Sequence, residues 1–186
     1  MTTGSGSEYA DHVARSTHLL DHGRFTTLAT LGEDGPWAST VNFVALRDPL
    51  RLLYYSLHRS RHSRNIGARP DIAGSVHLLG TPGFGLDGAQ FTGHCEAVPA
   101  SEVLWHRQVY YELNHPDPEV RAAWLLPESD FTGDGPRRFY VVRVHRWWLL
   151  DIDRWLTDKH DTRVEVDLAE LARPARPARP PRPPRP

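Results

Sequence analysis

Residues 54–79, YYSLHRSRHSRNIGARPDIAGSVHLL, join two apolar strands through a cationic turn and a short helix. The polar side chains of that turn are Arg59, Ser60, Arg61, His62 and Arg64. A helix N-terminus attracts anions through its dipole and its free N–H groups, and arginine adds forked, charge-assisted hydrogen bonds. The stretch therefore predicts a phosphate site at a strand-to-helix junction. A solvated basic turn is the alternative on charge alone.

Apolar segments on both sides of this stretch predict further strands. The expected strands cover residues 25–31, 37–46, 50–57, 72–79, 89–98 and 139–151, with a last short strand from Trp155 and residues 164–166. The connections are too short for repeated crossover helices, so the sheet should be antiparallel. A sheet of this size avoids exposed edges best by closing. We expect a mainly β fold, a six-stranded antiparallel β-barrel with peripheral helices.

Four helices are expected around this barrel, over residues 8–21, 60–68, 101–113 and 116–125. Ser60 is the expected N-cap of the second of these helices, and Pro70 marks its end. The length of 186 residues indicates one domain with a short appendage. We expect a disordered start at residues 1–7, the domain at residues 8–170 and a disordered Pro/Arg-rich tail at residues 171–186.

The ARP and PRP repeats of the tail favour polyproline II. Such a tail is either an inert low-complexity end or a ligand for an SH3-like domain.

The charge is distributed unevenly between this tail and the rest of the chain. The net charge is −1, and the five arginines of residues 173–186 leave −6 for residues 1–172. An acidic body argues against nucleic acid as a partner, because such a partner needs a basic face.

Other classes of protein are excluded by what the sequence lacks. No apolar run approaches the ~18 residues of a membrane span, and the first residues lack the basic and apolar regions of a signal peptide. Cys95 is the only cysteine, so it cannot form an internal disulfide, which suits a cytoplasmic protein. The presence of a single cysteine also excludes zinc sites of the Cys-x-x-Cys type.

The eleven histidines are dispersed along the chain. His18 and His22 have the spacing of one helical face, but no Glu completes the HExxH zinc pattern. We therefore expect no metal site. Haem needs less, because a buried His with an open face, or Cys95, is enough to ligate its iron.

Two short elements of the cationic stretch, Tyr55-Ser56 and Ser60-Arg61-His62, occur in a wider pattern. They follow a strand–turn–strand hairpin at residues 25–46 and precede the run LDGAQFTGHCEAV. This pattern resembles the FMN-binding split barrel of the pyridoxamine 5′-phosphate oxidase-like superfamily. His62 stands where the oxidases proper have Lys, and their C-terminal Arg-x-His substrate element is not evident.

The resemblance implies FMN at the interface of a homodimer. It implies that Arg61, His62 and Ser56 bind the FMN phosphate, with Arg59 and Arg64 in reserve. The residues implied around the flavin ring and its chain are Ser39, Thr40, Val41, Tyr55, Gln90 and Trp148, the last from the partner subunit. Trp147 and Trp148 should point to opposite faces of their strand, one into the core and one toward an interface or pocket.

The function that this resemblance implies is that of a flavin-dependent oxidoreductase acting on a small molecule. Its electron partner would be oxygen or NAD(P)H, and the cofactor would carry the redox chemistry, so no catalytic triad is needed. Three alternatives stay open: the same barrel binding the deazaflavin F420, the same barrel binding haem, and a cofactor-binding module without catalysis.

Overall fold

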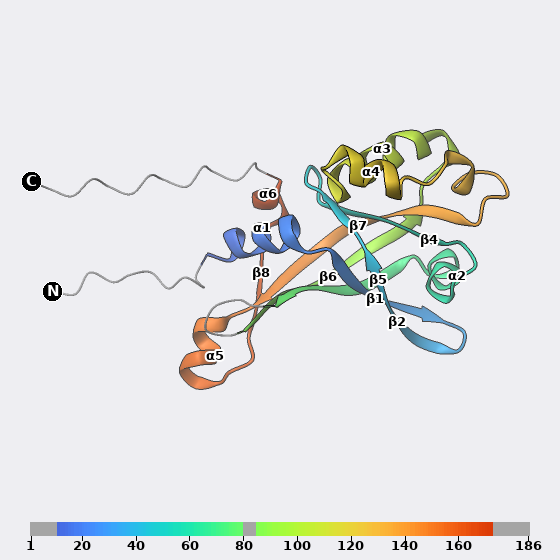
Figure 1. Ribbon diagram of the computed structural model, residues 1–186. Helices are drawn as coiled ribbons and strands as arrows, with labels where there is room; N and C mark the ends of the chain where they lie inside the picture. Colours follow the sequence, from blue (N-terminus) through green and yellow to red (C-terminus); the bar gives the residue numbers. More distant parts are fainter. Residues whose placement is uncertain (1–10, 80–84, 173–186) are drawn as a thin grey trace, which may run out of the picture.

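The computed structural model describes residues 11–79 and 85–172. The expected disordered start at residues 1–7 lies outside the described residues, as does the expected tail except for residues 171 and 172. Leu171 ends a short helix and is fully buried, so the folded part extends to it. The described chain is mainly β, with helices around the strands (Figure 1).

Within the described residues, eight strands form one antiparallel sheet. They are β1 (Phe25–Gly32), β2 (Gly35–Asn42), β3 (Val44–Leu46), β4 (Arg51–Leu57), β5 (Asp71–Leu79), β6 (Leu86–Ala97), β7 (Arg137–Leu150) and β8 (Arg163–Glu165). The hydrogen-bonded order is β2-β1-β5-β6-β7-β4-β3, and β8 pairs with β7. The strands at the two ends of this order, β2 and β3, are consecutive in the chain and are separated only by residue 43. They therefore act as one strand that closes the barrel, and β8 lies outside the closed ring. The prediction of a closed six-stranded antiparallel barrel is confirmed.

The strand expected over residues 37–46 is split where it passes from one neighbour to another. Phe43 separates β2, which pairs with β1, from β3, which pairs with β4. Its side chain is 1% exposed in the barrel core, and its N–H donates to the Arg24 carbonyl oxygen at 3.1 Å. This residue therefore leaves the ladder to fill the core at the point of closure.

The helices are α1 (His12–His22), α2 (Arg61–Ala68), α3 (Val103–Asn114), α4 (Pro118–Trp124), α5 (Ile152–Asp158) and α6 (Leu168–Leu171), with 3-10 turns η1 (Ala100–Glu102) and η2 (Glu128–Asp130). Ser60 caps α2 as expected, since its hydroxyl accepts a hydrogen bond from the Ser63 N–H at 3.3 Å. The prediction of a strand at Trp155 is wrong. The Asp151 carboxylate accepts from the Arg154 N–H at 3.0 Å and begins α5 there.

Two apolar clusters lie on opposite faces of the sheet. The barrel interior holds Tyr54, Phe91 and Trp147, each at most 1% exposed. A second cluster lies beneath α3 and is built from the aromatic residues Tyr110, Tyr111, Phe131 and Phe139 with aliphatic neighbours. The predicted division between the two tryptophans holds, because Trp147 is fully buried and Trp148 is half-buried.

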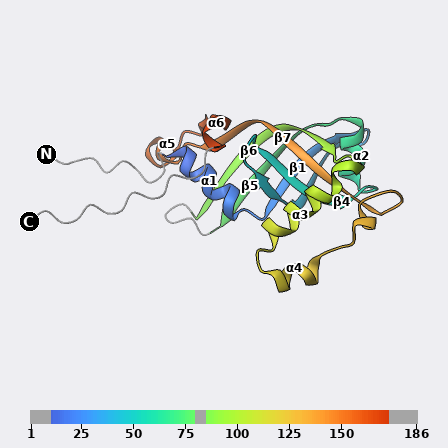
Figure 2. The same cartoon turned by 90° about the horizontal axis from the view of Figure 1, so that it is seen from above.

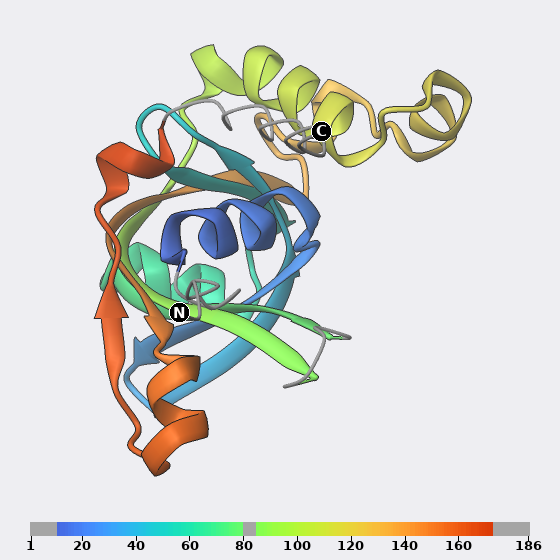
Figure 3. The ribbon, with the colours of Figure 1, turned by 90° about the vertical axis from the view of Figure 1, so that its left-hand side faces the viewer.

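The helices are distributed around the barrel rather than layered on one face. Figure 3 looks along the barrel and shows α1 across the near opening, with α2 beyond it at the far end. Figure 2 shows α3 against the side of the barrel and α4 projecting outward beyond it. None of the helices formed by residues 11–79 and 85–172 is long and apolar enough to cross a membrane.

Candidate functional site

The turn between β4 and α2 is a hydrogen-bonded cluster of hydroxyl groups around one imidazole. The His62 Nε2 atom lies 2.9 Å from the Ser56 hydroxyl and 3.1 Å from the Ser60 hydroxyl. Ser60 also donates to the Ser63 hydroxyl at 2.9 Å. His62 is 8% exposed, and burial lowers the pKa of its imidazole. A neutral ring at this position organises hydroxyl groups and supplies no cation of its own.

Arg61 places its guanidinium on the other side of the turn, against the β1–β2 hairpin. The guanidinium carbon lies 4.4 Å from the centroid of the Trp37 ring, which is a cation–π contact. The Nη2 atom also donates to the Asp34 carbonyl oxygen at a long 3.4 Å. Stacking therefore fixes the plane of the guanidinium while most of its donors remain available to an anion.

The first turn of α2 offers backbone donors next to this cation. The Ser60 hydroxyl satisfies the N–H of Ser63, and the Ser60 carbonyl oxygen accepts from the N–H of Arg64 at 3.1 Å. Among the hydrogen bonds of the described residues, none uses the N–H of Arg61 or His62. Together with the helix dipole, these groups suit a phosphate.

The other arginines around the turn serve the loops. Arg64 donates to the carbonyl oxygen of Arg59, and Arg69 donates to that of Gly32 at 3.4 Å. Arg138, across the ladder from Ser56 on β7, donates to the Gly135 carbonyl oxygen at 2.7 Å. Among the described contacts, Arg59 and Arg61 keep the most uncommitted donors, and Arg61 is the one that a stacking ring holds in place.

Two residues expected beside a flavin ring lie in apolar clusters. Val41 is 8% exposed and belongs to the barrel core. Tyr55 packs beneath α3, with edge-on ring contacts at 5.2 Å to Tyr110, 5.4 Å to Phe131 and 5.7 Å to Phe139. These side chains do not reach the α2 turn cluster, so any contact of Val41 with a ring at this site would come from the backbone.

Three other expected residues lie in one row on the outer face of the sheet. Thr40 pairs with Thr27, Thr27 with Ser75, Ser75 with Gln90, and Gln90 with Trp148. The next row on this face is also of small side chains, Ala38, Ala29, Ala73 and Thr92. Small side chains leave a shallow hollow of about 350 Å³, bounded by Trp148. Ser39 points to the opposite face, two residues from Trp37.

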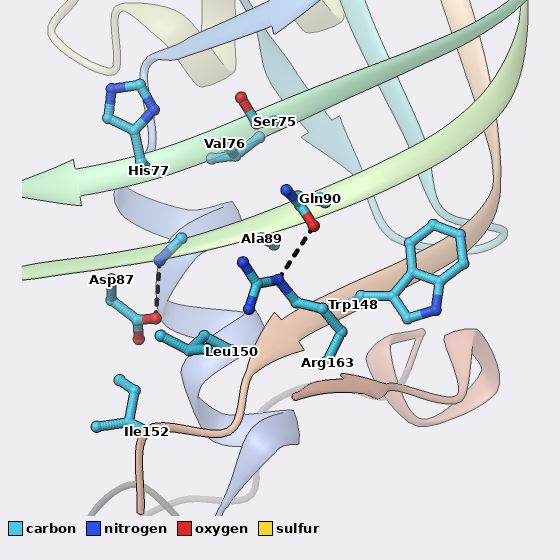
Figure 4. Close-up of a pocket in the computed structure, with 11 residues that line it drawn as sticks. Ser75, Val76, His77, Asp87, Ala89, Gln90, Trp148, Leu150, Ile152 and Arg163 are labelled. Atoms are coloured by element: carbon cyan, nitrogen blue, oxygen red, sulfur yellow. Dashed lines mark hydrogen bonds between the residues drawn. The ribbon is translucent and has the colours of Figure 1, made fainter. Parts of the chain in front are cut away.

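A deeper pocket of about 260 Å³ continues from this hollow toward α5 (Figure 4). The two share Ser75, Gln90 and Trp148. Arg163 reaches over from β8, and its Nε atom donates to the Gln90 side-chain oxygen at 3.2 Å. The far wall is apolar, with Leu150 and Ile152. We call the hollow and the pocket together the outer groove.

A buried ion pair holds the end of the outer groove. Arg15 of α1 donates to the Asp87 carboxylate through Nε at 3.0 Å and Nη2 at 2.7 Å. Arg15 also donates to the Leu150 carbonyl oxygen at 3.1 Å, and Asp87 accepts from the Gly88 N–H at 2.8 Å. The carboxylate is thus fully engaged, so it orders the strands and leaves no free charge for a ligand.

Trp148 forms a fixed wall of the groove because β8 holds it. The Arg146 guanidinium lies 4.7 Å from the Trp148 ring centroid and binds Glu165 through two hydrogen bonds of 2.9 and 2.6 Å. These hydrogen bonds from Arg146, followed by one from the Trp148 side chain, lower the pKa of Glu165. Sequence reasoning missed Arg146, Arg163 and Glu165, since nothing local signals a partner for Trp148.

Six of the nine expected site residues therefore gather at two separate places. Ser56, Arg61 and His62 meet at the α2 turn, whereas Thr40, Gln90 and Trp148 line the outer groove or its row. Across residues 11–79 and 85–172, no three side chains of the His, Cys, Asp or Glu type group as metal ligands would.

Comparison with known proteins identifies a family for this chain and solved structures with a similar fold. The sequence profile described as pyridoxamine 5′-phosphate oxidase matches residues 15–151 of this chain. A search among curated proteins found no match.

Similar solved structures include proteins described as binding different cofactors. An FAD-binding protein from Mesorhizobium loti is 18% identical, with a TM-score of 0.52 over 70% of this chain and 88% of that one. HutZ, the haem storage protein from Vibrio cholerae, is 17% identical, with a TM-score of 0.54 over 73% and 92%. General Stress Protein 26 from Bacillus anthracis is 12% identical, with a TM-score of 0.52 over 83% and 98%. At these identities the likeness shows the fold alone.

Proposed function

We propose a function for this chain, which belongs to the pyridoxamine 5′-phosphate oxidase family. In this proposal the protein is a flavin-dependent oxidoreductase that acts on a small molecule and binds FMN at the interface of a homodimer. The observation that carries the proposal is the α2 turn, where the stacked guanidinium of Arg61 lies beside unpaired helix N–H groups. A phosphate dianion is the ligand that such a set of donors binds best.

The residues of the α2 turn fit the phosphate end of FMN. Arg61 supplies the charge, and the N–H groups of Arg61 and His62 supply backbone donors. The Ser56 hydroxyl contributes a further hydrogen bond, with its orientation held by the His62 ring. His62 acts through this hydrogen bond, and burial lowers the pKa of its imidazole.

The two separate groups of site residues support a dimer. A ring that starts from the α2 turn of one subunit and ends against Gln90 and Trp148 has to meet these residues on a second copy. The outer face offers a surface for such a copy, since its central side chains are Ala, Ser and Thr and its margin exposes Phe25 by 57% and Leu31 by 46%. Small side chains let two sheets approach closely.

Bound FMN would supply hydride and electron transfer, with NAD(P)H or oxygen as the electron partner. The residues of this chain would bind and orient it. Backbone groups of Ser39, Thr40 and Val41 on β2 would meet the polar edge of the ring, and Gln90 would hydrogen-bond the ring or its chain. Tyr55 would support this end of β4 from beneath α3. The remainder of the outer groove would hold the small-molecule substrate and exclude water.

Haem is the second candidate cofactor, because a haem storage protein shares this fold. His77 lies at the rim of the outer groove, exposed, where an imidazole has room to bind iron. Deazaflavin F420 would use the same phosphate site at α2. A cofactor carrier without catalysis would keep the same binding residues.

An absorption spectrum of the purified protein separates these cofactors. The proposal expects flavin bands and FMN in the released material by mass spectrometry, followed by bleaching with NADPH or by turnover with oxygen. A Soret band would replace the proposal with the haem function. Flavin bands without any turnover would replace it with a carrier.

Sedimentation measures the dimer separately. We expect a dimer that an Ala73→Arg substitution on the outer face converts to monomer, because a guanidinium cannot be buried between two closely packed sheets without a partner. An equally bulky Leu156→Arg substitution on exposed α5 serves as the control and should leave the dimer intact.

A further inference from the structure

The helices α3 and α4 carry large apolar side chains that face solvent. Trp105 is 49% exposed, Val120 45% and Trp124 63%. Further exposed members are Leu104, Leu113 and Leu125. We call this set the α3–α4 surface. The opposite side of α3 is buried in the aromatic cluster, so α3 is firmly seated, whereas α4 buries none of its residues and is exposed. Grouped exposed apolar residues of this kind mark a docking surface.

The Trp124 ring is supported on one side within this surface. Its ring stacks on His115 at 5.8 Å with an interplanar angle of 8°, and His115 lies 6.3 Å from the Tyr111 ring. The Tyr111 hydroxyl accepts from the Leu126 N–H at 3.2 Å, which ties the end of α4 back to α3. A fixed flat ring loses little entropy when a ligand covers it.

The charge around this surface is opposite to that of the C-terminal tail. Residues 100–130 contain six acids and two arginines, a net charge of −4 with neutral His. Glu112 on α3 and Glu119 on α4 are both exposed. The sequence of residues 173–186, RPARPARPPRPPRP, holds five arginines and no acid. The two segments therefore attract each other.

The tail starts close enough to reach this surface. α6, which ends at Leu171, packs against α1. The C-terminal residues of α1 and of α3 line one small pocket of about 130 Å³, through Leu20, Asp21, Leu113 and Asn114. The 11 residues of α1 span about 16 Å. A 14-residue polyproline II segment spans about 43 Å, which exceeds this separation comfortably.

We propose that residues 173–186 dock on the α3–α4 surface of their own chain. Polyproline II segments bind aromatic surfaces, where the proline rings lie on indole rings and neighbouring charges read the arginines. Here Trp124 receives proline and arginine side chains, the latter through cation–π contact, and Glu112 and Glu119 pair with the remaining guanidiniums. This contact is independent of the cofactor and adds a self-recognition site to the proposed function.

Hydrogen exchange on two forms of the protein tests the proposal. One form is the full chain, and the other ends after Ala172. Amides of α3 and α4 should exchange more slowly in the full chain, by about fivefold, and equally at low and high protein concentration. Equal exchange in the two forms would overturn the proposal. Protection that grows with concentration would also overturn it, because the tail would then bind a second copy.

Substitutions locate the contact. Trp124→Ala in the full chain should remove most of the protection and weaken binding of a synthetic peptide of residues 173–186 to the shortened form by about fivefold. Leu156→Ala, an exposed change on α5, is the matched control and should alter neither. Because Trp124→Ala also removes the stack on His115, Glu119→Lys provides a second variant that reduces peptide binding by charge alone. Retained binding in both variants would refute the assignment.

Discussion

Two arginine–tryptophan stacks at different ends of the barrel show how similar contacts acquire different roles. Arg61 lies 4.4 Å from the Trp37 ring beside α2, and Arg146 lies 4.7 Å from the Trp148 ring beside β8. Figure 1 places α2 and β8 at opposite ends of the molecule. The geometry of the two stacks is nearly the same, but their surroundings are not.

The difference lies in the donors that each guanidinium has left. Arg146 binds both carboxylate oxygens of Glu165, so its charge is neutralised and its ring contact is structural. Arg61 has one long hydrogen bond to a carbonyl oxygen. The α2 turn therefore keeps an uncommitted cation, whereas the β8 end of the outer groove is a neutral wall. A cation becomes an anion site only where no carboxylate already satisfies it.

The two ends also differ in how they are held together, and the largest predicted effect tests this. Asp87→Asn leaves the buried Arg15 without its carboxylate, so the free energy of unfolding should fall by about 3–5 kcal/mol. Ser60→Ala removes only a helix cap at the α2 turn and should cost about 0.5–2 kcal/mol. Urea denaturation of both variants measures the difference. Equal losses would show that the groove end has no special anchor.

The second prediction compares the contributions of the two stacked arginines to FMN binding. Arg61→Ala removes charge-assisted hydrogen bonds to phosphate, each worth about 1.5–3 kcal/mol, so the dissociation constant for FMN should rise more than tenfold. Arg146→Ala should raise it less, because that guanidinium is already saturated by Glu165. Fluorescence titration of the apoprotein with FMN measures both constants. Riboflavin, which lacks the phosphate, is the control ligand and should bind the Arg61→Ala variant as it binds the unchanged protein.

The barrel could be predicted from sequence because its signals are local. Strand alternation, the Ser60 cap and the turn residues of the β1–β2 hairpin each act within a few positions, and the two faces of Trp147 and Trp148 follow from the strand period alone. The break at Phe43 could not be predicted in this way. It depends on where the barrel closes, and that is a property of all strands together.

The candidate site was harder to predict from sequence because its contacts join distant segments. No sequence feature near Arg61 predicts that it stacks on Trp37. Likewise, no feature near Trp148 predicts that Glu165 holds the arginine stacked on it. The Tyr55 ring illustrates the same point from the other side. Its position beside Ser56 suggests the cofactor, whereas the rings of α3 and β7 that surround it come from residues 110–139.

The third prediction concerns the neutral ring that organises the α2 turn. Burial lowers the pKa of His62, whereas an unfolded chain binds this proton with a pKa of about 6.5. The unfolded state therefore binds more protons as the pH falls below about 6.5, and the free energy of unfolding decreases with acid. His62→Asn should show a shallower decrease over the same range. Parallel acid slopes for the two proteins, without cofactor, would contradict a buried neutral His62.

The smallest predicted effect concerns the second stack, in which Glu165 holds Arg146 over Trp148. Glu165→Gln weakens the paired hydrogen bonds on Arg146, so the guanidinium is released from its fixed position over Trp148. Because both groups are exposed, the urea midpoint should stay unchanged. The near-ultraviolet circular dichroism of Trp148, isolated by subtracting a Trp148→Phe variant, should lose intensity as the ring becomes mobile. An unaltered signal would mean that the strand itself, and not the ion pair, fixes the wall of the groove, and the two stacks would then differ only in charge.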